Sequence, residues 1–172
     1  DPKSSEAGFQ TEDTARFNSD VAAKAVLANT AKLSEVNAAD FDGVFYPGGH
    51  GPMWDLGNDA QSISFIEAFW ALDKVVSTVC HASIALANTK DTNGEYIVKG
   101  RNITGFTNTE EAAVGLTDVV PLLVEDTLLD RGGLFSKIED WASNAQIDGN
   151  LITGQNPASS TAVAKLVLET LG

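Results

Sequence analysis

Cys80 is the residue with the clearest potential for chemistry. It follows the apolar run VVSTV (75–79), precedes His81, and is continued by the helical pattern ASIALA with no turn residue between. A strand that passes directly into a helix turns sharply, and the residue at that turn is exposed at the carboxyl end of the sheet. A helix N-terminus there would lower the pKa of the thiol and offer backbone N–H groups to an oxyanion. A lone cysteine is more often a small core residue, but this junction and the adjacent histidine favour a nucleophile.

A glycine-rich loop, Gly48-Gly49-His50-Gly51, follows the preceding apolar run GVFYP (43–47). Neighbouring parallel strands deliver their loops to the same edge of a sheet, so Gly48 and Gly49 could bring a backbone N–H against Cys80. Most such loops are only turns. The spacing of a dinucleotide or phosphate-binding loop is absent.

A cysteine nucleophile usually needs a base and an acid that orients the base. The sequence has only two histidines, His50 and His81. Glu110 and Glu111 come at the end of the next predicted strand, and one of them could hold His81. The alternative is that these two acids occupy the first turn of a helix, where the helix dipole favours them.

The elements that must position these residues alternate between strands and helices. The strands are short, continuous apolar runs, which is typical of a mainly parallel sheet covered on both faces. We therefore expect an α/β fold. The predicted elements are helices starting at Thr11 and Ser19, strands at 43–47 and 75–79, a helix from Asp59 to about Asp73, a short strand in RNITGF, a helix capped by Asn108, a hairpin or strand pair involving GLFSK and the LIT run after Asp148-Gly149-Asn150, and a last helix from Asn156-Pro157.

Composition excludes several classes of protein. The 172 residues contain 11 Lys and Arg against 24 Asp and Glu, for a net charge of −13, so nucleic-acid binding is not expected. No apolar run is long enough to cross a membrane, and the N-terminal residues do not resemble a leader peptide. One cysteine and two histidines make neither a disulfide nor an ordinary structural zinc site, and a reducing, cytoplasmic setting is favoured.

Four motifs together resemble the DJ-1/PfpI superfamily, and most closely its Hsp31-like branch of glutathione-independent glyoxalases. The motifs are FYPGGHGPMWDL (45–56), VCHA (79–82), ITGFTNTEE (103–111) and DGNLITGQNPASS (148–160). The resemblance implies a three-layer sandwich of the flavodoxin-like, class I glutamine amidotransferase-like type. The related glutamine amidotransferases take a histidine from a late H-x-E motif, and no histidine follows His81 here, so glutaminase activity is disfavoured.

The resemblance also implies roles for individual residues. Cys80 would be the nucleophile, with His81 beside it and a carboxylate at Glu111, and the backbone N–H groups of Gly49 and His81 would form an oxyanion hole. No metal or cofactor is implied. Gly48, His50, Trp54, Phe106 and Trp141 would line the substrate pocket, although aromatic residues are more often plain core or surface.

The implied activity is conversion of methylglyoxal and water to lactate without glutathione. Two alternatives use the same cysteine. One is a peptidase or protein deglycase, and the other is a redox-sensing stress chaperone in which Cys80 is oxidised reversibly.

Family members begin with a strand, a helix and a second strand, which bring a glutamate to the cysteine, and this sequence starts after them. We therefore expect residues 1–172 to be a single DJ-1/PfpI-type domain lacking its first strand-helix-strand, with unpaired edges beside 43–47 and 75–79. The missing segment could be supplied by a separate chain. A homodimer is also expected.

Overall fold

The computed structural model describes residues 6–172, and the chain divides into two compact units, Asp1–Val36 and Asn37–Gly172. The first unit contains the short 3-10 helices η2 (Ala7–Phe9) and η3 (Leu33–Glu35) and the helices α1 (Glu12–Ser19) and α2 (Val21–Ala28).

Thr11 caps α1 as predicted, because its hydroxyl accepts a hydrogen bond from the Thr14 N–H at 3.2 Å. The second helix is capped by Asp20 and not by Ser19. A carboxylate accepts the orphan N–H groups of a first turn as well as a hydroxyl does.

The second unit contains a four-stranded sheet in the order β1-β2-β6-β5. Strands β1 (Gly43–Tyr46), β2 (Val75–Val79) and β6 (Leu151–Gly154) are parallel, and β5 (Ala145–Asp148) pairs with β6 antiparallel. The β5–β6 hairpin turns at Gly149, whose φ of +62° suits glycine. Every residue of β2 and β6 is buried, as expected for strands covered on both faces.

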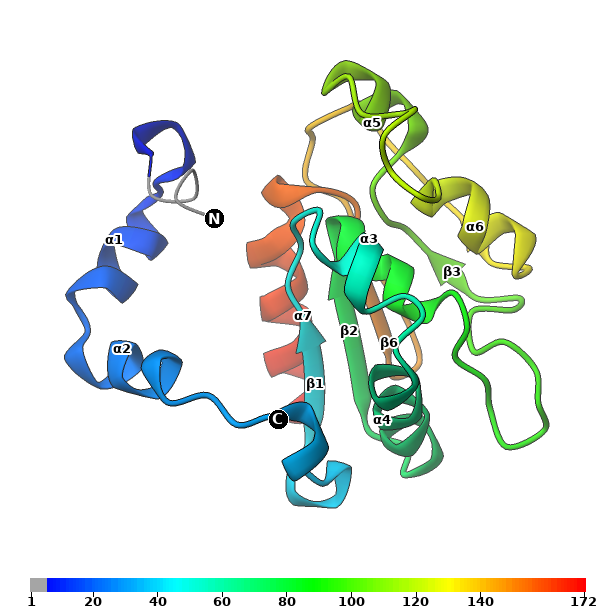
Figure 1. The fold of residues 1–172 in the computed structure, drawn as a ribbon, viewed down its shortest axis with the longest axis horizontal. Coiled ribbons are helices and arrows are strands. Elements are labelled where there is room, and N and C mark those ends of the chain that lie inside the picture. The colour runs from blue at the N-terminus through cyan, green and yellow to red at the C-terminus, as the bar shows by residue number, and fades with distance from the viewer. Residues whose placement is uncertain (1–5) are drawn as a thin grey trace. The chain divides into compact units, whose positions relative to one another are not determined.

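Helices cover both faces of this sheet, as Figure 1 shows. Helix α7 (Ser160–Leu171) packs on β2 and β6 through its fully buried Val163, and α4 (Ala60–Ala71) packs against β1 and β2 with Ile66 and Phe69 buried. The Asp59 side chain caps α4 by accepting from the Ser62 N–H at 2.7 Å. The expected three-layer α/β architecture is confirmed.

Shorter elements complete the second unit. They are η4 (Ala38–Asp40), α3 (Pro52–Asp55), η5 (Cys80–Leu86), β3 (Asn102–Ile103), α5 (Asn108–Ala113), α6 (Val124–Asp130), β4 (Leu134–Phe135) and η6 (Pro157–Ser159). Two predictions are corrected. The GLFSK strand, β4, pairs in parallel with β3 and not with the hairpin, and Thr107, not Asn108, caps α5. Thr107 is the N-cap because its capping box with Glu110 satisfies two backbone N–H donors at once.

Of the two strand edges that we expected to be unpaired, only that of β1 is open among residues 6–172. Within residues 6–172, β1 has β2 as its single neighbour in the sheet. Strand β2 is paired on both sides, because β6 occupies the position beside it that we expected to be open. The edge of β2 was therefore predicted wrongly.

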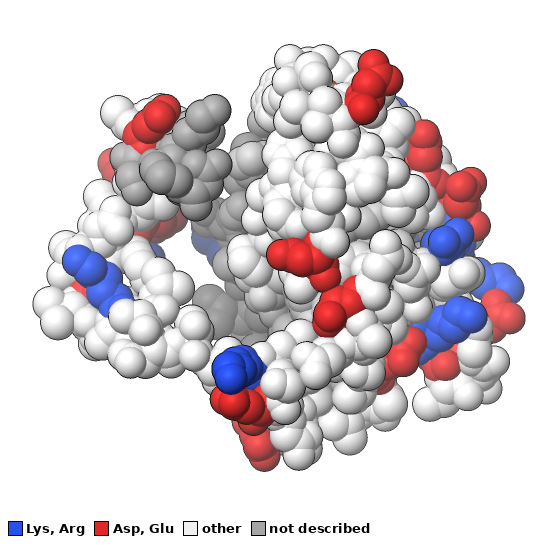
Figure 2. All heavy atoms as spheres, viewed as in Figure 1, with Lys and Arg blue, Asp and Glu red and all other residues white. Residues whose placement is uncertain are grey.

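Acidic side chains are spread over the face drawn in Figure 2, and the basic ones lie singly or beside acids. No helix among residues 6–172 is both long enough and apolar enough to span a bilayer.

Candidate active site

Cys80 lies at the sharp turn between β2 and η5, with φ at +61°. A non-glycine residue with this backbone conformation is uncommon and is typical of a strained functional turn. The predicted turn is present, but the side chain is only 4% exposed and η5 is a seven-residue 3-10 helix. Burial raises the pKa of the Cys80 thiol to about 12, so the expected lowering by a helix N-terminus is wrong.

A continuous chain of contacts leads from the thiol to a carboxylate. Cys80 Sγ lies 3.3 Å from His81 Nδ1, and His81 Nε2 lies 2.7 Å from Glu111 Oε2. His81 and Glu111 side chains are each 2% exposed. Burial lowers the pKa of His81 below its usual value, against the opposing effect of its hydrogen bond to Glu111. The structure thus brings together the three residues that the sequence grouped as catalytic, with Glu111 and not Glu110 against His81.

The glycine-rich loop after β1 lies against the thiol. The backbone N–H groups of His81 and Gly49 both donate to Cys80 Sγ and lower its pKa, although by less than burial raises it. Gly49 has φ at +101°, a conformation that strongly favours glycine. The two backbone N–H groups that the family resemblance assigns to an oxyanion hole therefore converge on the Cys80 sulfur.

Residue 48 must be glycine because its backbone lies very close to Cys80 and Val79. A Cβ at this position would lie 2.8 Å from Cys80 Cβ and 3.1 Å from the Val79 carbonyl oxygen. We expect Gly48→Ala to displace the loop, to lower stability by about 1–3 kcal/mol and to reduce turnover of the substrate proposed below by on the order of 100-fold. Denaturant titration and steady-state kinetics measure the two effects.

Gly51→Ala is the matched control for this substitution, because nothing lies within 4 Å of its added Cβ and its backbone is already helical. Equal effects of Gly48→Ala and Gly51→Ala would contradict the steric argument.

The three predicted aromatic pocket residues have different surroundings. Phe106 stacks on the His81 ring with centroids 3.9 Å apart, and Trp141 meets Phe106 edge-on at 5.8 Å. Trp141 is 46% exposed, and Trp54, on α3, is 57% exposed. No ring contact within the described residues includes Trp54. Phe106 therefore contacts His81 directly and Trp141 reaches it through Phe106, whereas no such link is seen for Trp54 among residues 6–172.

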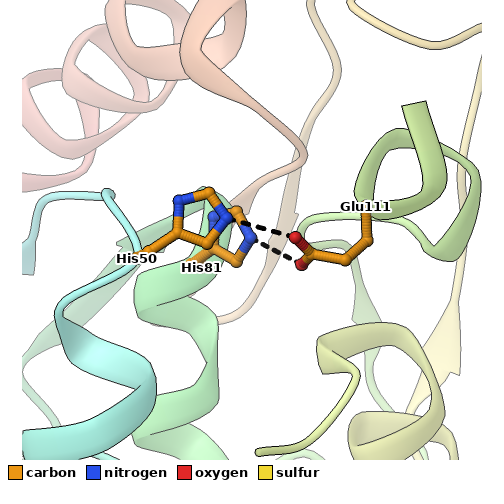
Figure 3. Close-up of side chains that lie close together, drawn as sticks. All are labelled: His50, His81 and Glu111. Atoms are coloured by element: carbon orange, nitrogen blue, oxygen red, sulfur yellow. Dashed lines mark hydrogen bonds and ion pairs between the residues drawn. The ribbon is translucent and has the colours of Figure 1, made fainter. Parts of the chain in front are cut away.

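His50 has a contact that the sequence did not predict. Its Nε2 lies 3.1 Å from Glu111 Oε1, so the two histidines share one carboxylate, with one oxygen facing each (Figure 3). The rings of His50 and His81 are 3.8 Å apart. The sequence placed His50 only at the pocket, because a contact between residues 61 positions apart depends on the tertiary fold.

Glu110 is a buried residue whose role the sequence missed. Its carboxylate accepts hydrogen bonds from the backbone N–H of Trp141 at 2.8 Å and of Thr107 at 3.1 Å. It also accepts from the side-chain amides of Asn156 at 2.7 Å and Gln155 at 3.2 Å, and from the Thr107 hydroxyl at 3.0 Å. Glu110 therefore fixes the start of α5, from which Glu111 reaches His81. The capping-box spacing of T-N-T-E was the available signal.

A mainly parallel sheet flanked by helices, with a cysteine at a strand-to-helix turn, defines an α/β protein of the class I glutamine amidotransferase-like fold. Residues 16–170 match the model of the DJ-1/PfpI family, and the chain belongs to this family.

Individual relatives agree with this assignment. The chain is 31% identical to Glyoxalase 3 of Candida albicans over 148 residues, and 33% identical to glutathione-independent glyoxalase HSP31 of Saccharomyces cerevisiae over 150 residues. These alignments cover 83% and 81% of this chain but 63% and 62% of the relatives, so the chain spans less than two thirds of their length. The crystal structure of the 24 kDa Rapid Encystment Protein of Francisella tularensis has a TM-score of 0.92 and 38% identity, with 100% of this chain and 76% of that one covered.

Proposed function

We propose that the protein is a cysteine-dependent, glutathione-independent glyoxalase that converts methylglyoxal and water to lactate. The observation that carries the proposal is the chain from Cys80 Sγ through His81 to Glu111, with the N–H groups of Gly49 and His81 directed at the sulfur. The names of the yeast relatives, Glyoxalase 3 and glutathione-independent glyoxalase, support the choice of substrate class.

The resting site holds a protonated thiol and a neutral imidazole, because burial raises the pKa of Cys80 to about 12 and lowers that of His81. In the tautomer that fits the contacts, His81 Nε2–H donates to Glu111 and Nδ1 accepts from the thiol. Addition to the aldehyde is then coupled to proton transfer. The Sγ–C bond forms as the thiol proton moves to Nδ1, and Glu111 stabilises the imidazolium.

The aldehyde oxygen becomes an oxyanion held by the N–H groups of Gly49 and His81. It takes the proton from His81 Nδ1, which gives a hemithioacetal and restores the neutral imidazole. A base then removes the proton from C1 and returns one to C2 through an enediol, and His81 Nδ1 is the base on this chain that lies beside the sulfur. The product is a lactoyl thioester. Water cleaves its C–S bond, and lactate leaves as the Cys80 thiol is regenerated.

The direct test is lactate formation from methylglyoxal by the purified protein, without glutathione and with a chelator present. We expect lactate to appear in proportion to methylglyoxal consumed. A parallel assay with peptide and glycated-peptide substrates tests the peptidase and deglycase alternative, which the same cysteine and histidine would serve. Cleavage of those substrates with no lactate formed would replace the glyoxalase assignment.

The protonation state of Cys80 gives a second prediction. A group whose folded pKa is raised stays protonated to higher pH, so only about one site in 10⁵ holds a thiolate at pH 7 when the pKa is about 12. Alkylation by iodoacetamide should keep rising with pH beyond the ordinary pKa of a thiol. Because Cys80 is the only cysteine, mass spectrometry reads its labelling without ambiguity.

The urea-unfolded protein is the control, in which labelling should level off above about pH 9, near the pKa of a free thiol. A plateau at neutral pH in the folded protein would show that the thiol is already ionised, and would overturn the coupled proton transfer.

A further inference from the structure

His50 has no part in the reaction steps above, yet it holds one oxygen of the catalytic carboxylate at 3.1 Å. It is also the accessible member of the group, because its side chain is 35% exposed while those of His81 and Glu111 are 2% exposed. The three side chains come from three elements, the loop after β1, the start of η5 and α5, and point toward one another in Figure 3.

The ligand atoms of these three residues all lie within 4.8 Å of one another. Around a tetrahedral Zn²⁺ with bond lengths of about 2.1 Å, ligand atoms lie roughly 3.4 Å apart, so small side-chain movements would close the group around an ion. Two imidazoles and a carboxylate, with a fourth position open to water, form a donor set that suits zinc. Glu111 supplies the third ligand that two histidines and one cysteine could not provide on their own.

We propose that His50, His81 and Glu111 form a binding site for Zn²⁺ that reversibly inactivates the enzyme. Inactivation rests on the proposed function, whereas metal binding does not. A zinc ion would bind His81 through Nε2, the nitrogen that faces Glu111, because Nδ1 faces the thiol. Neutral imidazole bound through Nε2 carries its proton on Nδ1. That nitrogen would then donate toward Cys80 and could not accept the thiol proton.

Cys80 is outside this donor group. Its sulfur is 3.3 Å from His81 Nδ1, on the opposite side of the ring from the carboxylate. Zinc binding should therefore be independent of the cysteine, which separates this site from ordinary metal capture by a reactive thiol. His50 is the ligand whose substitution tests this site, because it lies outside the contact chain from Cys80 to Glu111. Unspecific binding of Zn²⁺ is expected mainly at exposed acidic side chains, since the chain has a net charge of −13.

The experiment measures Zn²⁺ binding by calorimetry to the metal-free protein, with excess Mg²⁺ present to occupy exposed carboxylates. We expect one ion per chain in the wild type and in Cys80→Ala, and at least about a 10-fold loss of affinity in His50→Gln. Substitution by Co²⁺ should give visible ligand-field bands without the intense near-ultraviolet band of a sulfur ligand. Loss of binding in Cys80→Ala, or unchanged binding in His50→Gln, overturns the site.

Activity is read separately on the wild type. Lactate formation should fall over the same range of Zn²⁺ concentration as the binding curve and recover when EDTA is added. Binding without loss of activity overturns the inhibitory role. A wild type that binds zinc but never forms lactate refutes the proposed glyoxalase activity and leaves the metal site standing.

Discussion

Cys80→Ala is expected to eliminate lactate formation, with a loss on the order of 10⁴-fold in kcat, because the variant has no atom that can form the hemithioacetal. The thiol is the only sulfur nucleophile in the chain. Its removal takes one buried atom from the core beside β2, so stability should fall by only about 1 kcal/mol. Steady-state kinetics and thermal unfolding measure the two effects on one preparation.

Cys80→Ser is the matched control, because it keeps the size and hydrogen-bonding capacity of the side chain at the strained turn while replacing sulfur with a poorer nucleophile. It should unfold near the wild-type temperature and still lack turnover. If Cys80→Ala retains turnover within a few-fold of the wild type, the cysteine mechanism is wrong, whatever the fold of the variants.

The sequence was most informative where local chemistry decides the structure. Thr11 and Asp59 supply side-chain caps for the helices that follow them. The run VVSTV forms the fully buried central strand, and the sharp turn at Cys80 follows because the strand continues into η5 without a connecting loop. Elements and turns of this kind are specified by a few neighbouring residues.

The local sequence pattern could not predict the ionisation state of the Cys80 thiol. The helix after Cys80 suggested a lowered thiol pKa, whereas the surrounding core excludes water and raises it to about 12. Both effects are physically sound, and their balance depends on how deeply the thiol is buried. Exposure at a turn depends on the complete fold, and here Gly48 and Gly49 of the loop after β1 lie against Cys80.

The local sequence pattern also could not decide which of the adjacent acids Glu110 and Glu111 contacts His81. The sequence allowed either acid to hold His81, and favoured Glu111 because of the family resemblance. In the structure, Glu110 forms the capping box with Thr107 and accepts hydrogen bonds from the loops that contain Trp141 and Asn156. Glu111 contacts the two histidines. Neighbouring helical residues point about 100° apart, so two adjacent acids in the first turn of α5 face different surroundings, one in the capping box and one against the histidines.

Glu111→Gln should reduce kcat by on the order of 10³- to 10⁴-fold while leaving the fold intact, because a neutral amide cannot stabilise the imidazolium that forms when His81 takes the thiol proton. Substrate contacts are not removed, so KM should change little.

Glu110→Gln makes the same chemical change one residue earlier, and we expect it to affect stability. Its amide NH₂ would face donors where the carboxylate accepts five hydrogen bonds, so the free energy of unfolding should fall by about 3 kcal/mol.

The two variants are therefore expected to separate catalysis from stability. Glu111→Gln loses turnover at nearly wild-type stability, and Glu110→Gln loses stability while the molecules that remain folded retain measurable turnover. Kinetics corrected for the folded fraction, together with urea unfolding, give both quantities for each variant. The reverse pattern, full activity in Glu111→Gln and none in folded Glu110→Gln, would mean that the carboxylate serving His81 has been assigned one residue too late, despite the 2.7 Å contact between His81 Nε2 and Glu111 Oε2.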